Sequence, residues 1–357
     1  MEALQPLHPR LPHGGVGSDV PASRLLFYLY ALLVVVLSTL LDRSFLLDQQ
    51  NYIDNFIESA SLEWVRAMFE EESLLRGAIT QLFSEELLWR LWTTGFGLVL
   101  DPTTAVFITV CVLNGLMILA AARTDGPSLA LALWLVLPVG FAVTGLEQIR
   151  QGFGLGVVLY IALRMNRPVL GSLIAAMIHT TFALAFVFGV IHWLFKKRPL
   201  LALACSVSLA FAGAYLGGML FEMFGGRRLM VYSSTEGDAT SINYVFAGIL
   251  CILPSLYWLV TTTRQENEDP QAWTLSNLAL VHVAATCFTI FSFFMFPIGA
   301  GRIGYLTQLL LIPILPALLK RRHSNVTFAI SALLFLYLIY LTGKSYSDGV
   351  YAILLGR

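Results

Sequence analysis

Three arginine-containing sites lie at the ends of apolar segments, where they are suited to bind an anion. Arg150 occurs in GLEQIRQGFGLG, Arg227 and Arg228 follow two glycines, and Arg302 occurs in PIGAGRIGYLTQ. Arginine presents a planar fork of donors that matches phosphate oxygens. Neighbouring glycines let a ligand approach the backbone closely. If these arginines converge, they predict a binding site for a diphosphate.

Each arginine also has a simpler interpretation. An arginine at the end of a membrane helix often extends toward the lipid headgroups. Glu147 stands three residues before Arg150, where a continuous helix would bring the two charges together. A single arginine is therefore a weak indication of a site, and the prediction rests on the set.

His179 and Glu86 are the residues suited to catalytic proton transfer. His179 lies in the strongly apolar run IAAMIHTTFALAF. A histidine in a membrane helix is often a packed, hydrogen-bonded core residue. If the helix breaks here, Thr180 and Thr181 can satisfy the freed backbone groups and the imidazole, with an ordinary pKa of about 6.5, suits a general base. Glu86 precedes a largely apolar stretch and is the second choice of base, or a group that orients sugar hydroxyls.

Several reaction classes lack their motifs. The sequence contains no HExxH, GxSxG or P-loop motif and no acidic cluster of the metal-binding type. Metal hydrolysis, serine acyl transfer and nucleotide hydrolysis are therefore unsupported, and we expect no metal and no cofactor. The formal net charge is zero, so nucleic acid is not an expected partner.

The elements that position these residues must be membrane helices. Hydrophobic residues make up 57% of the chain and charged residues 12%, whereas soluble domains carry roughly 25% charged residues. Apolar runs of about 20 residues favour helices over a β-barrel. We predict an all-α polytopic membrane protein, with a disordered cytoplasmic segment at 1–23 and a single domain at 24–357. The expected helices, about ten in number, are 25–46, 102–122, 128–148, 149–163, 168–194, 199–223, 244–262, 275–297, 303–319 and 325–342.

Basic residues set the expected orientation, because Lys and Arg in short loops favour the cytoplasm. The basic clusters are 196–198, 320–322 and the pair Arg164 and Arg167. With all three inside, the loops 47–101 and 224–243 and the turn around Arg302 lie outside. Residues 168–194 then have basic flanks at both ends, which a single membrane crossing does not allow.

Two arrangements resolve this conflict. In the first, residues 79–100 cross the membrane and residues 168–194 cross once, which leaves Arg164 and Arg167 outside. In the second, residues 79–100 lie in or dip into the outer interface among interfacial helices, and residues 168–194 form two half-helices that meet near His179. We favour the second arrangement, because forcing Glu86 through hydrocarbon would cost about 2.5–3.5 kcal/mol.

The segment IRQGFGLGVVLYIALRMNRPVLGSLIAAMIHTTFALAF resembles the central signature of the EpsG-like branch of Wzy-type polysaccharide (O-antigen) polymerases. That signature is an Ile-Arg-Gln helix start, a short basic turn, and an Ala-rich run that ends in His and a small hydroxyl residue. Here these are 149–151, 164–167 and 175–180. The resemblance implies that Arg150 and Gln151 bind substrate and that His179 is catalytic.

Weaker likenesses lie outside this block and involve an early Asp and Tyr pair, a Glu, and a late Arg with an aromatic residue. In this sequence they are Asp48 and Tyr52, Glu86, and Arg302 and Tyr305. Two positions depart from the family pattern. Leu87 stands where the family often has Pro after the Glu, and Thr180 where it often has Ser after the His, so no fixed role is transferred to Glu86.

The resemblance implies a glycosyltransferase in the bacterial inner membrane with its site on the outer side. It would take a glycan from undecaprenyl diphosphate and join it to another lipid-linked repeat unit, with inversion and with lipid diphosphate as leaving group. The implied partners are the lipid-linked donor and acceptor, membrane lipid and a chain-length-regulating co-polymerase. An O-antigen ligase and a lipid-linked-sugar transporter or flippase remain alternatives.

Overall fold

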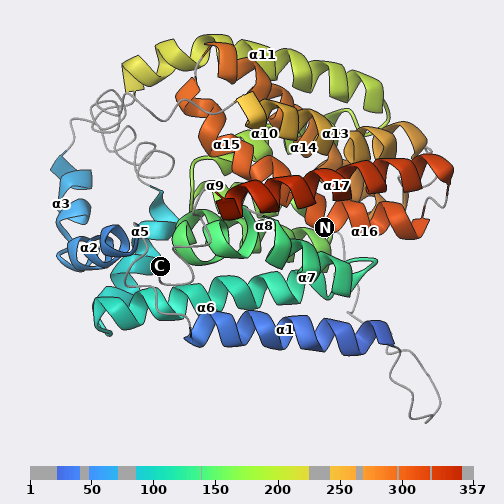
Figure 1. The fold of residues 1–357 in the computed structure, drawn as a ribbon. Helices are drawn as coiled ribbons and strands as arrows, with labels where there is room; N and C mark the ends of the chain where they lie inside the picture. The colour runs from blue at the N-terminus through green and yellow to red at the C-terminus, as the bar shows by residue number, and fades with distance from the viewer. Residues whose placement is uncertain are drawn as a thin grey trace, which may run out of the picture.

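The computed structural model describes residues 22–40, 48–70, 86–137, 139–224, 242–262, 268–295, 297–321 and 324–347, and every regular element within these ranges is a helix. The helices, labelled in Figure 1, are α1 (Ala22–Leu40), α2 (Gln49–Ala60), α3 (Glu63–Glu70), α5 (Leu87–Gly97), α6 (Pro102–Ala121), α7 (Pro127–Val136), the π-helix η2 (Val139–Glu147), α8 (Ile149–Met165), α9 (Pro168–Ala176), α10 (Phe182–Leu194), α11 (Pro199–Phe224), α13 (Ile242–Thr261), α14 (Pro270–Met295), α15 (Pro297–Leu309), α16 (Leu311–Arg321) and α17 (Asn325–Ser347).

Four helices of the described residues are long and apolar enough to cross a membrane, namely α1, α6, α14 and the Pro199–Gly217 part of α11. A fifth span results if α7 and η2, which are bent by 71°, are counted as one. The prediction of a helical membrane protein is confirmed, whereas about ten spans are not. Several predicted segments are divided into shorter helices, as at Leu310 between α15 and α16, three residues before the helix-interrupting Pro313.

Helix α1 shows how lipid acts as the solvent. Leu25, Tyr28 and Leu32 are 57%, 62% and 60% exposed, while only Val34 and Ser38 of this helix are buried. A large exposed apolar face is typical of a surface that contacts a membrane. In Figure 1 α1 runs beside α6 along one side of the bundle, and α2, α3 and α5 gather at one end of it.

The segment that was predicted to lie at the interface contains short helices in its described parts, 48–70 and 86–101. Of residues 79–100, the described part forms α5, with 11 residues, which is about 16 Å long at 1.5 Å per residue and too short for a hydrocarbon core of about 30 Å. Helix α5 packs closely on α2, because a Cβ atom at Gly97 would lie 2.7 Å from the carbonyl oxygen of Phe56. The arrangement favours the second of the two predicted topologies.

Helices α9 and α10 form a helical hairpin. Helix α9 ends at Ala176 and α10 begins at Phe182, so the predicted break near His179 is confirmed. A Cβ atom at Gly189, late in α10, would lie 3.6 Å from Cγ2 of Val169, at the start of α9. The chain therefore reverses at the tip, residues 177–181, rather than continuing in one direction.

Helices α6 and α8 are parallel, and this shows which helix ends lie on the same side of the bundle. A Cβ atom at Gly152 would lie 3.4 Å from Cδ1 of Leu113, and one at Gly156 would lie 3.0 Å from Cβ of Leu116. The contacts advance together along both helices. The first turn of α8, with Arg150, therefore lies beside the middle of α6, toward the side of the bundle where α6 begins.

Residues of all three basic clusters lie at the opposite end. Asp125, just after α6, contacts Arg321 at the end of α16, with 2.7 Å between Oδ2 and Nε. Arg164 lies in the last turn of α8, which ends beside the end of α6. The α9–α10 hairpin brings Lys196 back to the same end, as the favoured topology requires.

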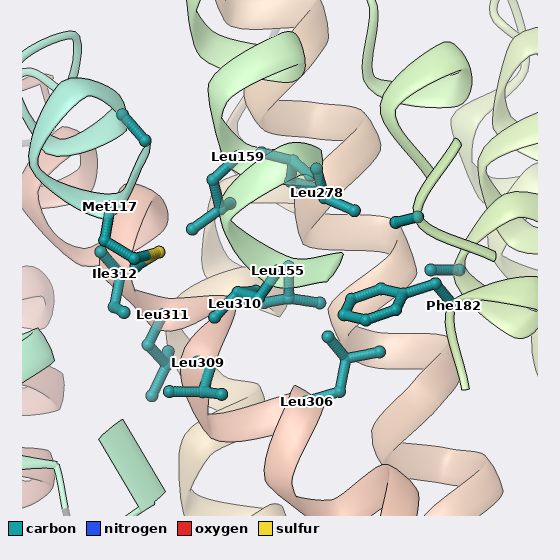
Figure 2. Close-up of a cluster of buried hydrophobic side chains, with 14 of the residues drawn as sticks. Met117, Leu155, Leu159, Phe182, Leu278, Leu306, Leu309, Leu310, Leu311 and Ile312 are labelled. Atoms are coloured by element: carbon teal, nitrogen blue, oxygen red, sulfur yellow. The ribbon is translucent and has the colours of Figure 1, made fainter. Parts of the chain in front are cut away.

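The hydrophobic core joins the elements that carry the predicted site. Figure 2 shows Leu155 of α8, Phe182 of α10 and Leu306 of α15 in one buried cluster. Gly154 makes room for this contact, because a Cβ atom there would lie 2.5 Å from Cε2 of Phe182. The packing brings the hairpin tip to the level of the first turns of α8.

Candidate functional site

A buried ion pair joins three distant segments of the chain. Nη1 of Arg150 lies 2.7 Å from Oε2 of Glu86, and the side chains are 25% and 1% exposed. The other carboxylate oxygen of Glu86 accepts hydrogen bonds from the backbone N–H of Thr180, at 3.0 Å, and from its hydroxyl, at 3.3 Å. Such charge-assisted bonds are needed, because an unpaired carboxylate in this position would be strongly destabilising.

Glu86 holds an unusual backbone conformation. It precedes α5 with φ 59° and ψ 63°, in the left-handed region, which costs a residue other than glycine about 1–3 kcal/mol. The following turn is tied to the hairpin tip, because the N–H of Leu88 donates to the carbonyl oxygen of Met177 at 2.9 Å. The bonds to the tip and to Arg150 offset this strain, and strain of this kind is typical of functional sites.

His179 lies at the hairpin tip, 6% exposed, and its ring forms a T-shaped pair with that of Phe182, with 6.4 Å between the centroids. Its Nδ1 accepts a hydrogen bond of 3.2 Å from the backbone N–H of Thr181. A neutral imidazole that accepts through Nδ1 carries its proton on Nε2. In this arrangement Nε2 is a hydrogen-bond donor.

Tyr52 of α2 contacts the start of α8. The backbone of Arg150 hydrogen-bonds to its hydroxyl, which satisfies one of the groups that a helix leaves unpaired in its first turn. Burial raises the pKa of Tyr52 to about 12, while the charge of Arg150 opposes this shift and that of Asp48 adds to it. Asp48 is the N-cap residue of α2, and its Oδ1 accepts from Asn51 at 3.1 Å.

The first turn of α8 has the properties of an anion site. Its N-cap residue, Gln148, provides no side-chain cap, and the helix dipole places partial positive charge at this end. Gln151, in the same turn, is buried at 4% exposure. Nε of Arg150 is buried, and none of the residues that the structure describes forms a hydrogen bond with it. These contacts bring six of the predicted site residues into one region of the molecule, namely Asp48, Tyr52, Glu86, Arg150, Gln151 and, at the hairpin tip, His179.

The local partner that the sequence offered to Arg150 is replaced by a distant one. Glu147 and Arg150 are not on one continuous helix face, because η2 ends at Glu147 and Gln148 has φ −89° and ψ 59°. The pairing with Glu86 was not predicted. The signal for it was a carboxylate at the start of an apolar stretch, which requires a cation when it is buried.

The remaining predicted arginines are described only in part. Arg302 and Tyr305 belong to α15, which packs against η2, and Leu306 of α15 lies in the cluster with Leu155. The side chains of Arg302 and Tyr305, and the whole of Arg227 and Arg228, lie outside the described residues.

Two other histidines are core residues. Nδ1 of His282 lies 2.6 Å from Oγ of Ser255, and Nδ1 of His192 lies 3.3 Å from Nδ2 of Asn277. These pairs link α14 to α13 and α10, away from Arg150. Within the described ranges, no group of three or more His, Cys, Asp or Glu residues has the arrangement needed to hold a metal ion.

An apolar groove of about 370 Å³ runs along α5, beside the ion pair rather than at it. It is lined by Leu91, Trp92, Gly95, Phe96, Val99 and Leu100. Trp92 donates through Nε1 to Oγ1 of Thr109 at 2.9 Å and packs on Phe153, with 4.7 Å between ring centroids. Phe153 lies one helical turn after Arg150, so the groove adjoins the charged site.

Comparison with known proteins identifies the family. The sequence model of the EpsG family matches residues 23–353, which is nearly the whole chain. No curated protein and no solved structure matches it. The family match covers every element that contributes to the Glu86–Arg150 pair and to the hairpin tip. The chain therefore belongs to the EpsG family.

Proposed function

We propose that this protein is a polysaccharide polymerase that joins undecaprenyl-diphosphate-linked oligosaccharide repeat units at the outer face of the bacterial inner membrane. Membership of the EpsG family supports a membrane protein of the polysaccharide-polymerase kind. The observation that carries the finer proposal is Arg150, held by Glu86 at the start of α8. A guanidinium group beside a helix N-terminus suits a diphosphate.

The proposed orientation rests on the two ends of the bundle. Arg164, Lys196 and Arg321 lie at the end opposite Arg150, and basic residues in short connections favour the cytoplasm. The site then faces the periplasm. A cysteine at position 150, introduced after replacement of the native cysteines, should react with an impermeant thiol reagent added from outside. Labelling from the cytoplasmic side alone would contradict the orientation.

In the proposed reaction the donor diphosphate binds at the first turn of α8. Arg150 neutralises the charge that grows on the diphosphate as the bond to the anomeric carbon breaks. Glu86 fixes the guanidinium, and Nε2–H of His179 donates to the leaving group. As a base, His179 would first have to change its tautomer, so the tip geometry favours the donor role.

The remaining predicted residues complete the proposed substrate site. Gln151, Tyr52 and Asp48 lie close enough to the start of α8 to bind the sugar next to the diphosphate. We propose Arg302, Tyr305, Arg227 and Arg228 as further substrate-binding residues. The apolar groove on α5 suits the isoprenoid chain, since it adjoins Arg150 through Phe153 and has a volume typical of ligand sites, about 300–1,000 Å³.

Incubation of the purified protein, in nanodiscs, with an undecaprenyl diphosphate oligosaccharide tests this function. We expect a ladder of products that differ by one repeat unit. Transfer of a single unit to an added lipid A core without a ladder would indicate a ligase instead. Movement of the lipid-linked sugar across a vesicle membrane without a new glycosidic bond would indicate a transporter. The Arg150→Ala protein serves as the inactive control.

A further inference from the structure

Glu147 is a carboxylate that the mechanism above does not use. It is the last residue of η2 and is half-buried. Within the part of the chain that the structure describes, its carboxylate has no hydrogen bond and no ion pair. It therefore differs from Glu86, both of whose oxygens are engaged. A free, half-buried carboxylate can accept a proton without first breaking an existing bond.

Glu147 belongs to the same region as Arg150. One residue, Gln148, separates it from α8, and Asp48 is close enough for its negative charge to act on it. The carbonyl oxygen of Asp48 in turn accepts from the N–H of Tyr52 at 3.1 Å, and the hydroxyl of Tyr52 bonds to the backbone of Arg150. Glu147 and Asp48 thus lie beside the proposed diphosphate position.

The surroundings of Glu147 suit proton uptake. Burial and, to a smaller extent, the like charge of Asp48 favour the protonated form of Glu147. Glu147 ends η2, a π-helix of nine residues, and π-helical segments occur frequently at functional sites. Glu147 also stands on the element that leads directly into the first turn of α8, so its position relative to Arg150 is set by a short connection.

The other acid–base groups of the site are less suited to removing a proton. Glu86 is held by Arg150 and Thr180. His179 accepts from the backbone through Nδ1, so its Nε2 already carries a proton. Tyr52, with a pKa raised by burial to about 12, keeps its proton near neutral pH.

We propose that Glu147 is the general base of the glycosyl transfer, which deepens and rests on the proposed function. Glu147 takes the proton from the acceptor hydroxyl as the oxygen forms its bond to the anomeric carbon. The bond between that carbon and the diphosphate oxygen breaks, and the diphosphate leaves with the bonding electrons toward Arg150. Attack and departure on opposite faces of the sugar ring invert the anomeric configuration.

The Glu147→Gln protein in nanodiscs tests this role by chemical rescue. We expect the rate of glycosyl transfer to fall about 10²–10⁴-fold, the usual contribution of a general base, with little change in the KM for the donor. Azide carries no proton that must be removed. Added azide should therefore restore donor consumption by the variant and give a glycosyl azide of inverted configuration.

The matched control is Asp54→Asn, which removes an exposed carboxylate on α2 that bonds only to Gln50 within the described chain, at 2.8 Å. It should behave like the wild type. Any of three results for Glu147→Gln would overturn the base assignment: an unchanged transfer rate, a rate that falls without azide rescue, or a loss of donor binding. If the wild-type protein consumes no donor, the proposed function itself fails. If the wild type and Glu147→Gln polymerise the donor at the same rate, only the assignment of Glu147 fails.

Discussion

The two ends of the helix bundle each contain a short arginine–carboxylate pair, and they differ in what surrounds it. Both pairs have a closest contact of 2.7 Å, and Arg150 and Arg321 are similarly exposed, at 25% and 27%. Asp125, however, is shared between Arg321 and Lys320, which is 64% exposed. Glu86 is 1% exposed and occupies a left-handed backbone conformation.

Distance alone therefore does not distinguish the pair at the proposed site from the pair at the other end. The Asp125 pair ties the connection after α6 to the end of α16, where solvent and a second cation share the charge. The Glu86 pair places an arginine at a helix N-terminus, where the dipole attracts anions. Only the second pair combines burial, backbone strain and an anion-binding position.

The largest expected effect is that of Arg150→Lys on activity. A lysine keeps the charge but loses the planar fork, and removal of one donor that stabilises a developing anion lowers rates by about 10²–10³-fold. Initial rates of polymer formation by the purified protein measure it. Arg321→Lys, at the other end, should retain a rate near that of the wild type. Equal losses in both variants would remove the distinction between the ends.

The next effect concerns stability. Glu86→Ala leaves the guanidinium of Arg150 without its carboxylate, and breaking a buried pair in this way costs about 3–5 kcal/mol. Asp125→Ala removes a carboxylate that is 10% exposed and is shared with Lys320, which is 64% exposed, so its cations can regain water and we expect a smaller loss. Thermal unfolding of both variants in the same detergent, monitored by circular dichroism, compares them. A larger loss of stability in Asp125→Ala than in Glu86→Ala would contradict this prediction.

A smaller, selective effect is expected in the groove. A Cβ atom at Gly95 would meet nothing within 4 Å, so Gly95→Leu should fold normally while filling the groove. The KM for a long-chain lipid diphosphate donor should rise several-fold, and that for a short-chain donor should stay constant. Gly115→Leu, on α6, is the control, because its Cβ would also meet nothing within 4 Å. Equal effects on both donors would exclude the groove as the chain site.

The smallest effect is that of Tyr52→Phe, which removes the bond to the Arg150 backbone. One hydrogen bond contributes about 0.5–1.5 kcal/mol. Burial raises the pKa of Tyr52 in the folded protein to about 12, so its contribution to stability is present below about pH 10 and is lost as the pH rises through 12. Denaturant unfolding at pH 8 and pH 11 should show that loss in the wild type and a smaller one in Tyr52→Phe. The same pH dependence in both would contradict the role of Tyr52.

The sequence alone indicated that the protein lies in lipid, favoured a helical hairpin in residues 168–194 and pointed to the family. The scarcity of charge and the long apolar runs require lipid. The basic residues at both ends of 168–194 favoured an arrangement in which that segment turns back, and the structure has the break near His179. The Ile-Arg-Gln and Ala-rich motifs resembled the family whose model matches residues 23–353. These features are local in the chain, or follow from the partition of each segment between water and lipid, so composition and spacing are sufficient to reveal them.

Only the tertiary structure decided which acid meets Arg150. The segment before α6 contains many carboxylates, and Glu147 was closer in sequence than Glu86. The choice depends on the packing of α5 against the hairpin tip and on the left-handed conformation of Glu86. The tautomer of His179 depends likewise on the backbone N–H of Thr181 at the tip. Such contacts join segments distant in sequence through helix packing and individual φ and ψ values, and hydrophobic periodicity and charge counts contain no information about either.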